Sequence, residues 1–287
     1  MLNPPAAAVL APKDHQTWSE TAYDWMLRSQ QMQAHYSMPH DPSSAAWSFI
    51  RPSERNGTGI AFVDAALAKH NGSTLPVVEL RGSHRTGKTW TLITLAARFV
   101  AETRLSRFRS DENIDIDELP QVVILDCNQD AMASRLLRAV RSVLLRQLPE
   151  DDGLEKEIIS CMSRIHYIFS EDMAGWVPTL ESLRSGLSSV SSDHPTLILW
   201  DGFLSDTGEA AERMEVIRQL TRLMRDCTIL LVTTALPTRR FAVWDKHVTQ
   251  RITLEQMNPI PEGGHDFVAT VQNNRIPYTI TSGGILC

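Results

Sequence analysis

Cysteine is scarce in this chain, and its cysteines lie far apart. Cys127, Cys161, Cys227 and Cys287 form no close pair in the sequence. The chain therefore carries neither a zinc-binding signature nor the disulfide framework of a small secreted domain. This spacing fits a reducing compartment.

Long apolar runs and an excess of positive charge are also missing. The apolar run at residues 229–232 is far too short to cross a bilayer. The first residues contain no basic stretch of the kind that opens a secretory signal. The net charge of −6 argues against a nucleic-acid-binding protein held mainly by a global positive field, although it leaves room for local basic patches. We therefore expect no membrane association.

The chain does have a glycine-rich loop between an apolar extended run and a helical pattern. Residues 82–89 read G-S-H-R-T-G-K-T and match G-x-x-x-x-G-K-T, the pattern of phosphate-binding loops. Glycine at both ends of the loop allows backbone conformations that a Cβ would hinder. The loop amides and the helix N-terminus then face phosphate. The residues predicted to hold the nucleotide are Gly82, Ser83, His84, Arg85, Thr86, Gly87, Lys88 and Thr89.

This loop predicts ATP and Mg²⁺ as ligands. Lys88 would reach the β- and γ-phosphates, and the Thr89 hydroxyl would hold Mg²⁺. The apolar run at residues 196–201 ends in Asp201, a position that places a carboxylate beside the metal in phosphate-loop proteins. The alternatives are a strand-to-helix turn that binds nothing, and an aspartate that only forms a turn with Gly202.

Alternating apolar runs and helical patterns predict an α/β domain with a mainly parallel sheet, which would bind its nucleotide at the carboxyl ends of the strands. Expected strands are 76–80, 121–125, 165–169, 196–201, 228–234, 252–254 and 278–280. Expected helices are 58–69, 89–100, 131–148, 155–162, 176–188 and 209–225, with a charged connector at 104–119. Residues 1–54 are interpreted as a flexible leader with one docking helix, and residues 55–287 as the core.

One segment combines basic and aromatic residues. Within 236–251, Arg239, Arg240 and Lys246 alternate with Trp244 and other aromatics. Such a segment suits single-stranded DNA, through phosphate contacts and base stacking. It equally suits an ordinary loop that Trp244 pins to the core, and the sequence does not separate the two.

Four segments, taken together, resemble the ATPase core of RecA-type eukaryotic recombinases. They are the phosphate loop, the strand that ends at Asp126, the strand that ends at Asp201, and the end of the strand at Thr233–Thr234. The resemblance covers roughly residues 55–287 and is stronger for the short paralogues of this family. It implies a RecA-like core and a role in homologous recombination. It also implies assembly with other recombinase paralogues in the nucleus, where the complex would support recombinase filaments on single-stranded DNA.

Two positions depart from the pattern of the active family members. Asn128 stands where these have a glutamate that orients the attacking water, and Ala235 stands where a glutamine senses the γ-phosphate. An amide cannot act as a general base, a role worth about 10²–10⁴ in rate. The resemblance therefore implies ATP binding with weak or no hydrolysis. The alternatives are an active ATPase, as a DNA motor or small-molecule kinase that uses Asp126 or Asp130, and an interaction module that makes no use of ATP.

Overall fold

A computed structural model describes residues 57–68, 76–108, 121–127, 132–148, 153–189, 196–203, 208–238, 241–257 and 266–287. The predicted leader at 1–54 and four residues named above, Asn128, Asp130, Arg239 and Arg240, lie outside these ranges. The division at residue 54 and the roles of these four residues therefore stay predictions.

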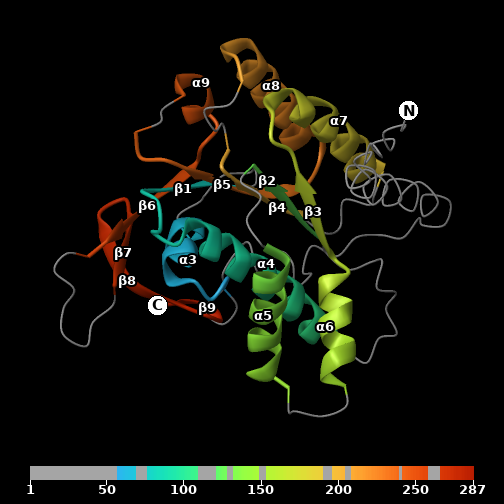
Figure 1. The fold of residues 1–287 in the computed structure, drawn as a ribbon, viewed down its shortest axis with the longest axis vertical. Helices are drawn as coiled ribbons and strands as arrows, with labels where there is room; N and C mark the ends of the chain where they lie inside the picture. The colour runs from blue at the N-terminus through green and yellow to red at the C-terminus, as the bar shows by residue number, and fades with distance from the viewer. Residues whose placement is uncertain are drawn as a thin grey trace, which may run out of the picture.

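One sheet of nine strands organises the described residues, in the order β3-β2-β4-β5-β1-β6-β7-β8-β9 (Figure 1). Neighbours from β3 to β6 are parallel, and neighbours from β6 to β9 are antiparallel. The strands are β1 Val77–Gly82, β2 Val122–Asp126, β3 Ile165–Phe169, β4 Thr196–Asp201, β5 Ile229–Ala235, β6 Gln250–Gln256, β7 Phe267–Val271, β8 Asn274–Thr281 and β9 Gly284–Leu286. The expected α/β class with a mainly parallel sheet is confirmed.

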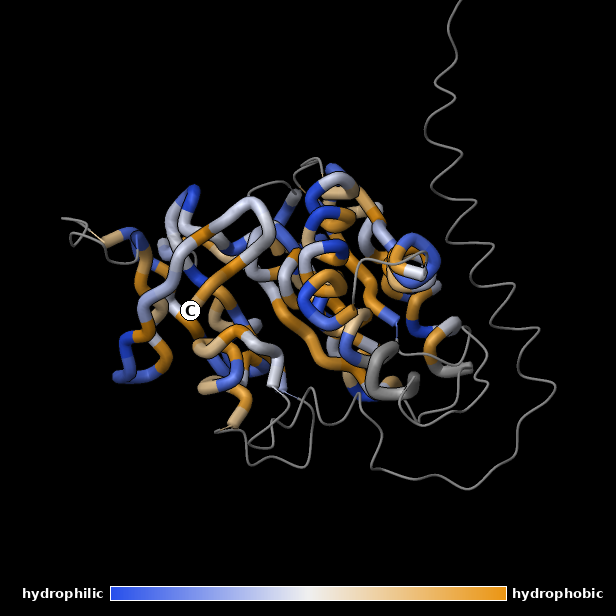
Figure 2. The backbone as a smooth tube through the Cα atoms, turned by 90° about the horizontal axis from the view of Figure 1, so that it is seen from below, coloured by the Kyte–Doolittle hydropathy of each residue, from blue (hydrophilic) through white to orange (hydrophobic). Residues whose placement is uncertain are grey.

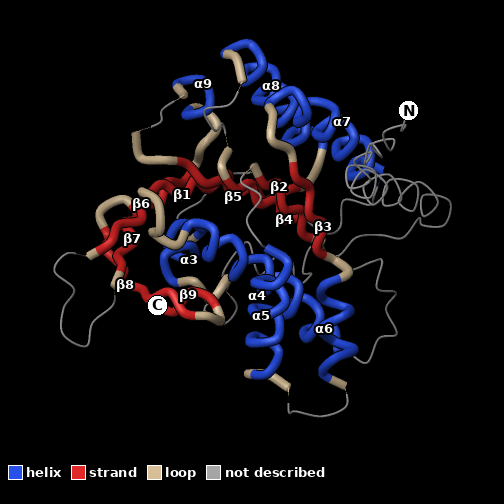
Figure 3. The backbone as a smooth tube through the Cα atoms, in the orientation of Figure 1, coloured by secondary structure: helices blue, strands red, loops and turns tan. Residues whose placement is uncertain are grey.

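Helices cover both faces of the parallel part of the sheet (Figure 3). One face carries α3 Ala61–Leu67, α4 Lys88–Phe108, α5 Met132–Leu145 and α6 Leu154–Met162; the other carries α7 Met173–Ser189, α8 Ala210–Asp226 and α9 Ala242–Asp245.

The central strands β1, β2, β4 and β5 are buried on both faces, because successive side chains point to opposite sides of the sheet and helices cover both sides. In β2, Val122 and Ile124 join the cluster under α3–α6, whereas Val123 and Leu125 join the cluster under α7 and α8. This double burial explains the continuous apolar runs of the parallel strands. Figure 2 shows the same arrangement as hydrophobic strands in the middle of the domain.

Two regions differ from the expected boundaries. α4 continues to Phe108, so residues 104–108 of the predicted connector are helical. The run from Lys88 to Phe108 contains no glycine or proline and is rich in good helix formers, which favours this continuation. β7 was not expected at all; with β6, β8 and β9 it forms an antiparallel extension of the sheet.

Among the described helices, none is both long enough and apolar enough to span a bilayer.

Candidate nucleotide-binding site

The phosphate loop lies between the end of β1 and the start of α4, as the sequence predicts. Gly82 closes β1, and a Cβ there would lie 2.4 Å from Thr86 Oγ1 and 2.6 Å from the Leu254 carbonyl oxygen, so only glycine fits. Gly87 has a φ of +82°, in the left-handed region that glycine tolerates best. Arg85 has a φ of 63°, which is uncommon for a residue with a side chain. The loop is thus a tightly folded turn.

Lys88 closes the loop from inside. Its Nζ donates hydrogen bonds to the carbonyl oxygens of Gly82, at 2.8 Å, and Ser83, at 2.6 Å. Thr86 Oγ1 donates to the Ser83 carbonyl oxygen at 2.9 Å. Burial lowers the pKa of Lys88 from its usual value, and the negative charge of Asp201 opposes that shift. The ammonium group is therefore held among loop carbonyls and beside a carboxylate.

Asp201 joins three elements at the carboxyl end of the sheet. Its Oδ2 accepts a hydrogen bond from Thr89 Oγ1 at 2.6 Å, and its Oδ1 accepts one from Thr234 Oγ1 at 2.6 Å. Thr234 Oγ1 in turn accepts from the Gly202 amide at 2.8 Å. The structure therefore brings together Thr89 and Asp201, which stand 112 positions apart in the chain.

This arrangement fits Mg²⁺. Hydroxyl and carboxylate oxygens are ligands that Mg²⁺ prefers, with water and phosphate oxygens completing its shell. Across the part of the chain that the structure describes, no group of three or more His, Cys, Asp and Glu side chains could bind a metal without such help. Asp201 also precedes a turn, because Gly202 has a positive φ of 74°. The turn and a metal-binding role for Asp201 are compatible with each other.

Thr234 is a residue of the site that the sequence argument did not assign. The parallel register pairs Trp200 with Thr233, so the next residues, Asp201 and Thr234, stand side by side at the strand ends. The Thr-Thr pair that ends an apolar strand is the signal that could have pointed to it.

A second carboxylate lies one strand away and, like Asp201, is buried. Asp126 is paired in register with Asp201 and has no solvent-exposed surface. Its Oδ2 accepts a hydrogen bond from Tyr167 Oη of β3 at 2.5 Å. The adjacent Cys127 Sγ accepts from Trp200 Nε1 at 3.3 Å, and burial raises the pKa of this thiol to about 11. Asp126 is thus tied to Tyr167 of β3, whereas Asp201 is tied to Thr89, the residue that follows Lys88 of the phosphate loop.

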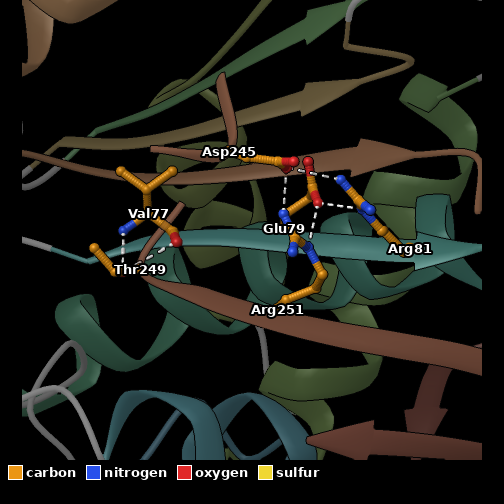
Figure 4. A network of polar contacts seen from close by, with 6 residues as sticks. All are labelled: Val77, Glu79, Arg81, Asp245, Thr249 and Arg251. Carbon is orange, nitrogen blue, oxygen red and sulfur yellow. Dashed lines mark hydrogen bonds and ion pairs between the residues drawn. The ribbon is translucent and has the colours of Figure 1, made fainter. Parts of the chain in front are cut away.

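Buried charges hold the end of β1 against α9 and β6 (Figure 4). Glu79 Oε2 accepts hydrogen bonds from Nε of Arg81 and, at 2.8 Å, from Nε of Arg251. Asp245 Oδ1 accepts from Nη2 of Arg81 at 3.1 Å and from Nη2 of Arg251 at 2.6 Å. We call these four side chains the β1 charge network. It fixes the residue that immediately precedes the phosphate loop.

The basic and aromatic segment does not present its tryptophan to solvent. Trp244 is 1% exposed, and its ring centroid lies 4.5 Å from that of Phe203. Lys246 is exposed, while Arg239 and Arg240 lie outside the described residues. Of the two interpretations left open, the pinned loop describes Trp244; the predicted stacking of this ring on a DNA base does not fit its burial.

Comparison with protein-family models finds no match, and comparison with curated sequences finds none either. Among solved structures, the chain is similar to the crystal structure of the RadB recombinase, with a TM-score of 0.51 and 17% sequence identity. The match covers 79% of this chain and 97% of the RadB chain. At this identity the likeness establishes the fold, which is RecA-like.

Proposed function

We propose that this chain is an ATP-binding recombinase paralogue with weak or no ATP hydrolysis, closest in kind to X-ray repair cross-complementing protein 2. It would act as a subunit of a nuclear complex for double-strand-break repair by homologous recombination. Its partners would be other recombinase paralogues. The complex would support recombinase filaments on single-stranded or branched DNA.

The observation that carries the ATP part of the proposal is the meeting of the phosphate loop with Asp201. The loop supplies backbone amides and Lys88, and Thr89 and Asp201 supply oxygens at hydrogen-bond distance of each other. Lys88 would bind the phosphates of a nucleotide, and Thr89 and Asp201 would hold Mg²⁺, which would offset the phosphate charge. The RecA-like fold supports the recombination part.

The weak-turnover part rests on two carboxylates: the glutamate that Asn128 replaces, and Asp126, which is hydrogen-bonded to Tyr167. Asn128 replaces the expected glutamate in the sequence. Asp126 is buried and bonded to Tyr167. Bound ATP would then stabilise the fold or a subunit interface instead of driving a cycle.

The test is a thermal unfolding series on the full chain with increasing Mg-ATP. A ligand that binds only the native state stabilises it by about 2.7 kcal/mol at 100 times its Kd. We expect Mg-ATP to raise the Tm of the wild type and to leave that of Lys88→Ala unchanged. Lys156→Ala, which removes an exposed lysine of α6, is the matched control and should respond like the wild type.

Two results would contradict the proposal. A wild-type Tm that excess Mg-ATP does not move would remove the ATP role and leave an interaction module. Brisk phosphate release from Mg-ATP by the wild type, at the roughly 1–100 s⁻¹ typical of active kinases, would contradict weak hydrolysis.

A further inference from the structure

The C-terminal strands contact the phosphate loop directly. Tyr278 of β8 donates a hydrogen bond from Oη to the carbonyl oxygen of Thr86 at 2.6 Å, across 192 positions of sequence. The Tyr278 side chain has no exposed surface. This bond is a polar link between β8 and the loop.

The ring of Tyr278 is held on two sides. Its centroid lies 5.2 Å from that of Phe62 in α3 and 5.4 Å from that of Phe267 in β7, and the Phe267 ring is stacked on it. Burial also raises the pKa of the Tyr278 hydroxyl from its usual value, so the group stays protonated and able to donate. The hydroxyl is therefore presented to the loop in one orientation.

Two further contacts tie the same strands to the loop and to α4. A Cβ on Gly87 would lie 2.8 Å from Ile280 Cδ1, so β8 packs directly against this glycine. The Ile285 amide of β9 donates to Thr94 Oγ1 at 3.1 Å, and Thr94 Oγ1 donates to the Trp90 carbonyl oxygen at 2.8 Å.

These contacts fix both peptide groups around Gly87. The Gly87 carbonyl oxygen accepts from the Thr91 amide at 2.8 Å and from Thr91 Oγ1 at 2.9 Å. On the other side, Tyr278 holds the Thr86 carbonyl. In a planar trans peptide the C=O and the following N–H point in opposite directions, so the Gly87 N–H points away from the Tyr278 hydroxyl. An amide with this fixed direction needs no reorientation before it binds an anion.

We propose that Tyr278 is a positioning residue for phosphate: by holding the Thr86 carbonyl, it fixes the orientation of the Thr86–Gly87 peptide, whose N–H is one of the loop amides. This inference rests on the proposed ATP binding and adds a residue to it. The bland alternative is a tyrosine that only fills the core between Phe62 and Phe267. The two differ in what the hydroxyl alone does for ligand affinity.

The experiment is isothermal titration of Mg-ATP into the full chain and its Tyr278→Phe variant, at a temperature well below either Tm. The variant keeps the ring contacts and loses the hydroxyl. A net hydrogen bond is worth roughly 1 kcal/mol and tenfold in affinity is about 1.4 kcal/mol, so we expect the Kd to rise about five- to tenfold. The control is Thr221→Val, which removes a 2.7 Å hydroxyl bond to the Ile217 carbonyl in α8. That variant should keep the wild-type Kd, whatever happens to its Tm.

The outcomes separate the two levels of the argument. A wild type without Mg-ATP binding overturns the proposed function and this inference together. A binding wild type with an equal Kd for Tyr278→Phe overturns this inference alone. Should Tyr278→Phe fail to fold, Phe267→Leu decides, because it removes the ring that is stacked on Tyr278 and so loosens the hydroxyl that this ring orients. We expect a raised Kd, and an unchanged Kd overturns the inference.

Discussion

Replacing Glu79 by glutamine tests whether burial makes the β1 charge network strong. Glu79 is 2% exposed at its side chain and Arg81 is 6% exposed, whereas Asp245 and Arg251 are 31% and 37% exposed. Glu79→Gln keeps the shape of the side chain and removes its charge. Arg81 is then left buried with Asp245 as its charged partner, at 3.1 Å.

The size of the effect follows from this burial. Removing one partner of a buried ion pair costs about 3–5 kcal/mol, because the other charge stays desolvated without compensation. Since Arg81 keeps Asp245, we expect the lower end, about 3 kcal/mol of unfolding free energy. Arg251→Gln should cost only about 1 kcal/mol, because its side chain is more than a third exposed and water replaces the lost bonds.

Urea unfolding followed by circular dichroism measures these differences through the midpoint and slope of the transition. The matched control is Arg141→Gln. It breaks a pair with Glu155 of the same 2.6 Å length as the Arg251–Asp245 pair, but with side chains 55% and 67% exposed. An exposed pair contributes about 0–1 kcal/mol, so this variant should remain close to the wild type.

A double substitution separates the loss of the Glu79–Arg81 contact from the cost of leaving the Arg81 charge buried without Glu79. Replacing Glu79 and Arg81 together by methionine removes both buried charges and leaves the Arg251–Asp245 pair intact. Apolar replacement of a whole buried pair is often neutral, so the double variant should be more stable than Glu79→Gln alone. If Glu79→Gln costs no more than Arg141→Gln, or if the double variant is the less stable of the two, the reasoning from desolvation is refuted.

Two further predictions concern turnover and pH. Asn128→Glu should raise the rate of phosphate release from Mg-ATP, by up to about 10²–10⁴ if the carboxylate acts as a general base; brisk release by the unchanged protein would contradict weak hydrolysis. Glu102 has its pKa raised from 4.5 to about 7, mainly by burial, with Asp64 adding to the shift and Arg98 opposing it. Because the folded state holds this proton more tightly, stability should fall as pH rises from about 4.5 to about 7. Glu102→Gln should remove that slope in urea unfolding at successive pH values, and an unchanged slope would assign it to other groups.

The place of the phosphate loop and its meeting with Asp201 were predictable because their constraints are local or topological. The spacing of Gly82, Gly87 and Lys88 fixes the loop within eight residues. The meeting of Thr89 with Asp201 follows from parallel strands, whose carboxyl ends share one edge of the sheet. The first expectation needed only a local motif, and the second needed only the order of strands and helices.

The C-terminal strands were harder to predict because their register is set by distant partners. β7 shows a mixed burial pattern, so its five residues lack the continuous apolar run that identified the parallel strands. The link from Tyr278 to Thr86 has no signal in either segment taken alone. The turn between β7 and β8 consists of Gln272 and Asn273, and Asn is a residue that tight turns favour. In the structure Gln272 takes a φ of 54°, as the first residue of some tight hairpin turns requires.

The segment around Trp244 shows a different limit. Basic and aromatic residues give the same composition whether a ring faces DNA or the core. The deciding quantity is burial, and that depends on Phe203, which follows β4. Composition therefore left two interpretations, and packing chose between them for Trp244.

The site depends on residues that its motif does not contain. The loop of residues 82–89 could match its pattern in full and still lack Thr234, which shares the Asp201 carboxylate with Thr89. It could equally lack Tyr278, which holds one of its carbonyls. Both residues come from strands that reach the loop only when the sheet has formed, so the loop geometry is a property of the folded domain. A nucleotide bound to this loop would therefore stabilise β8 as well, because Tyr278 and Ile280 of that strand contact the loop.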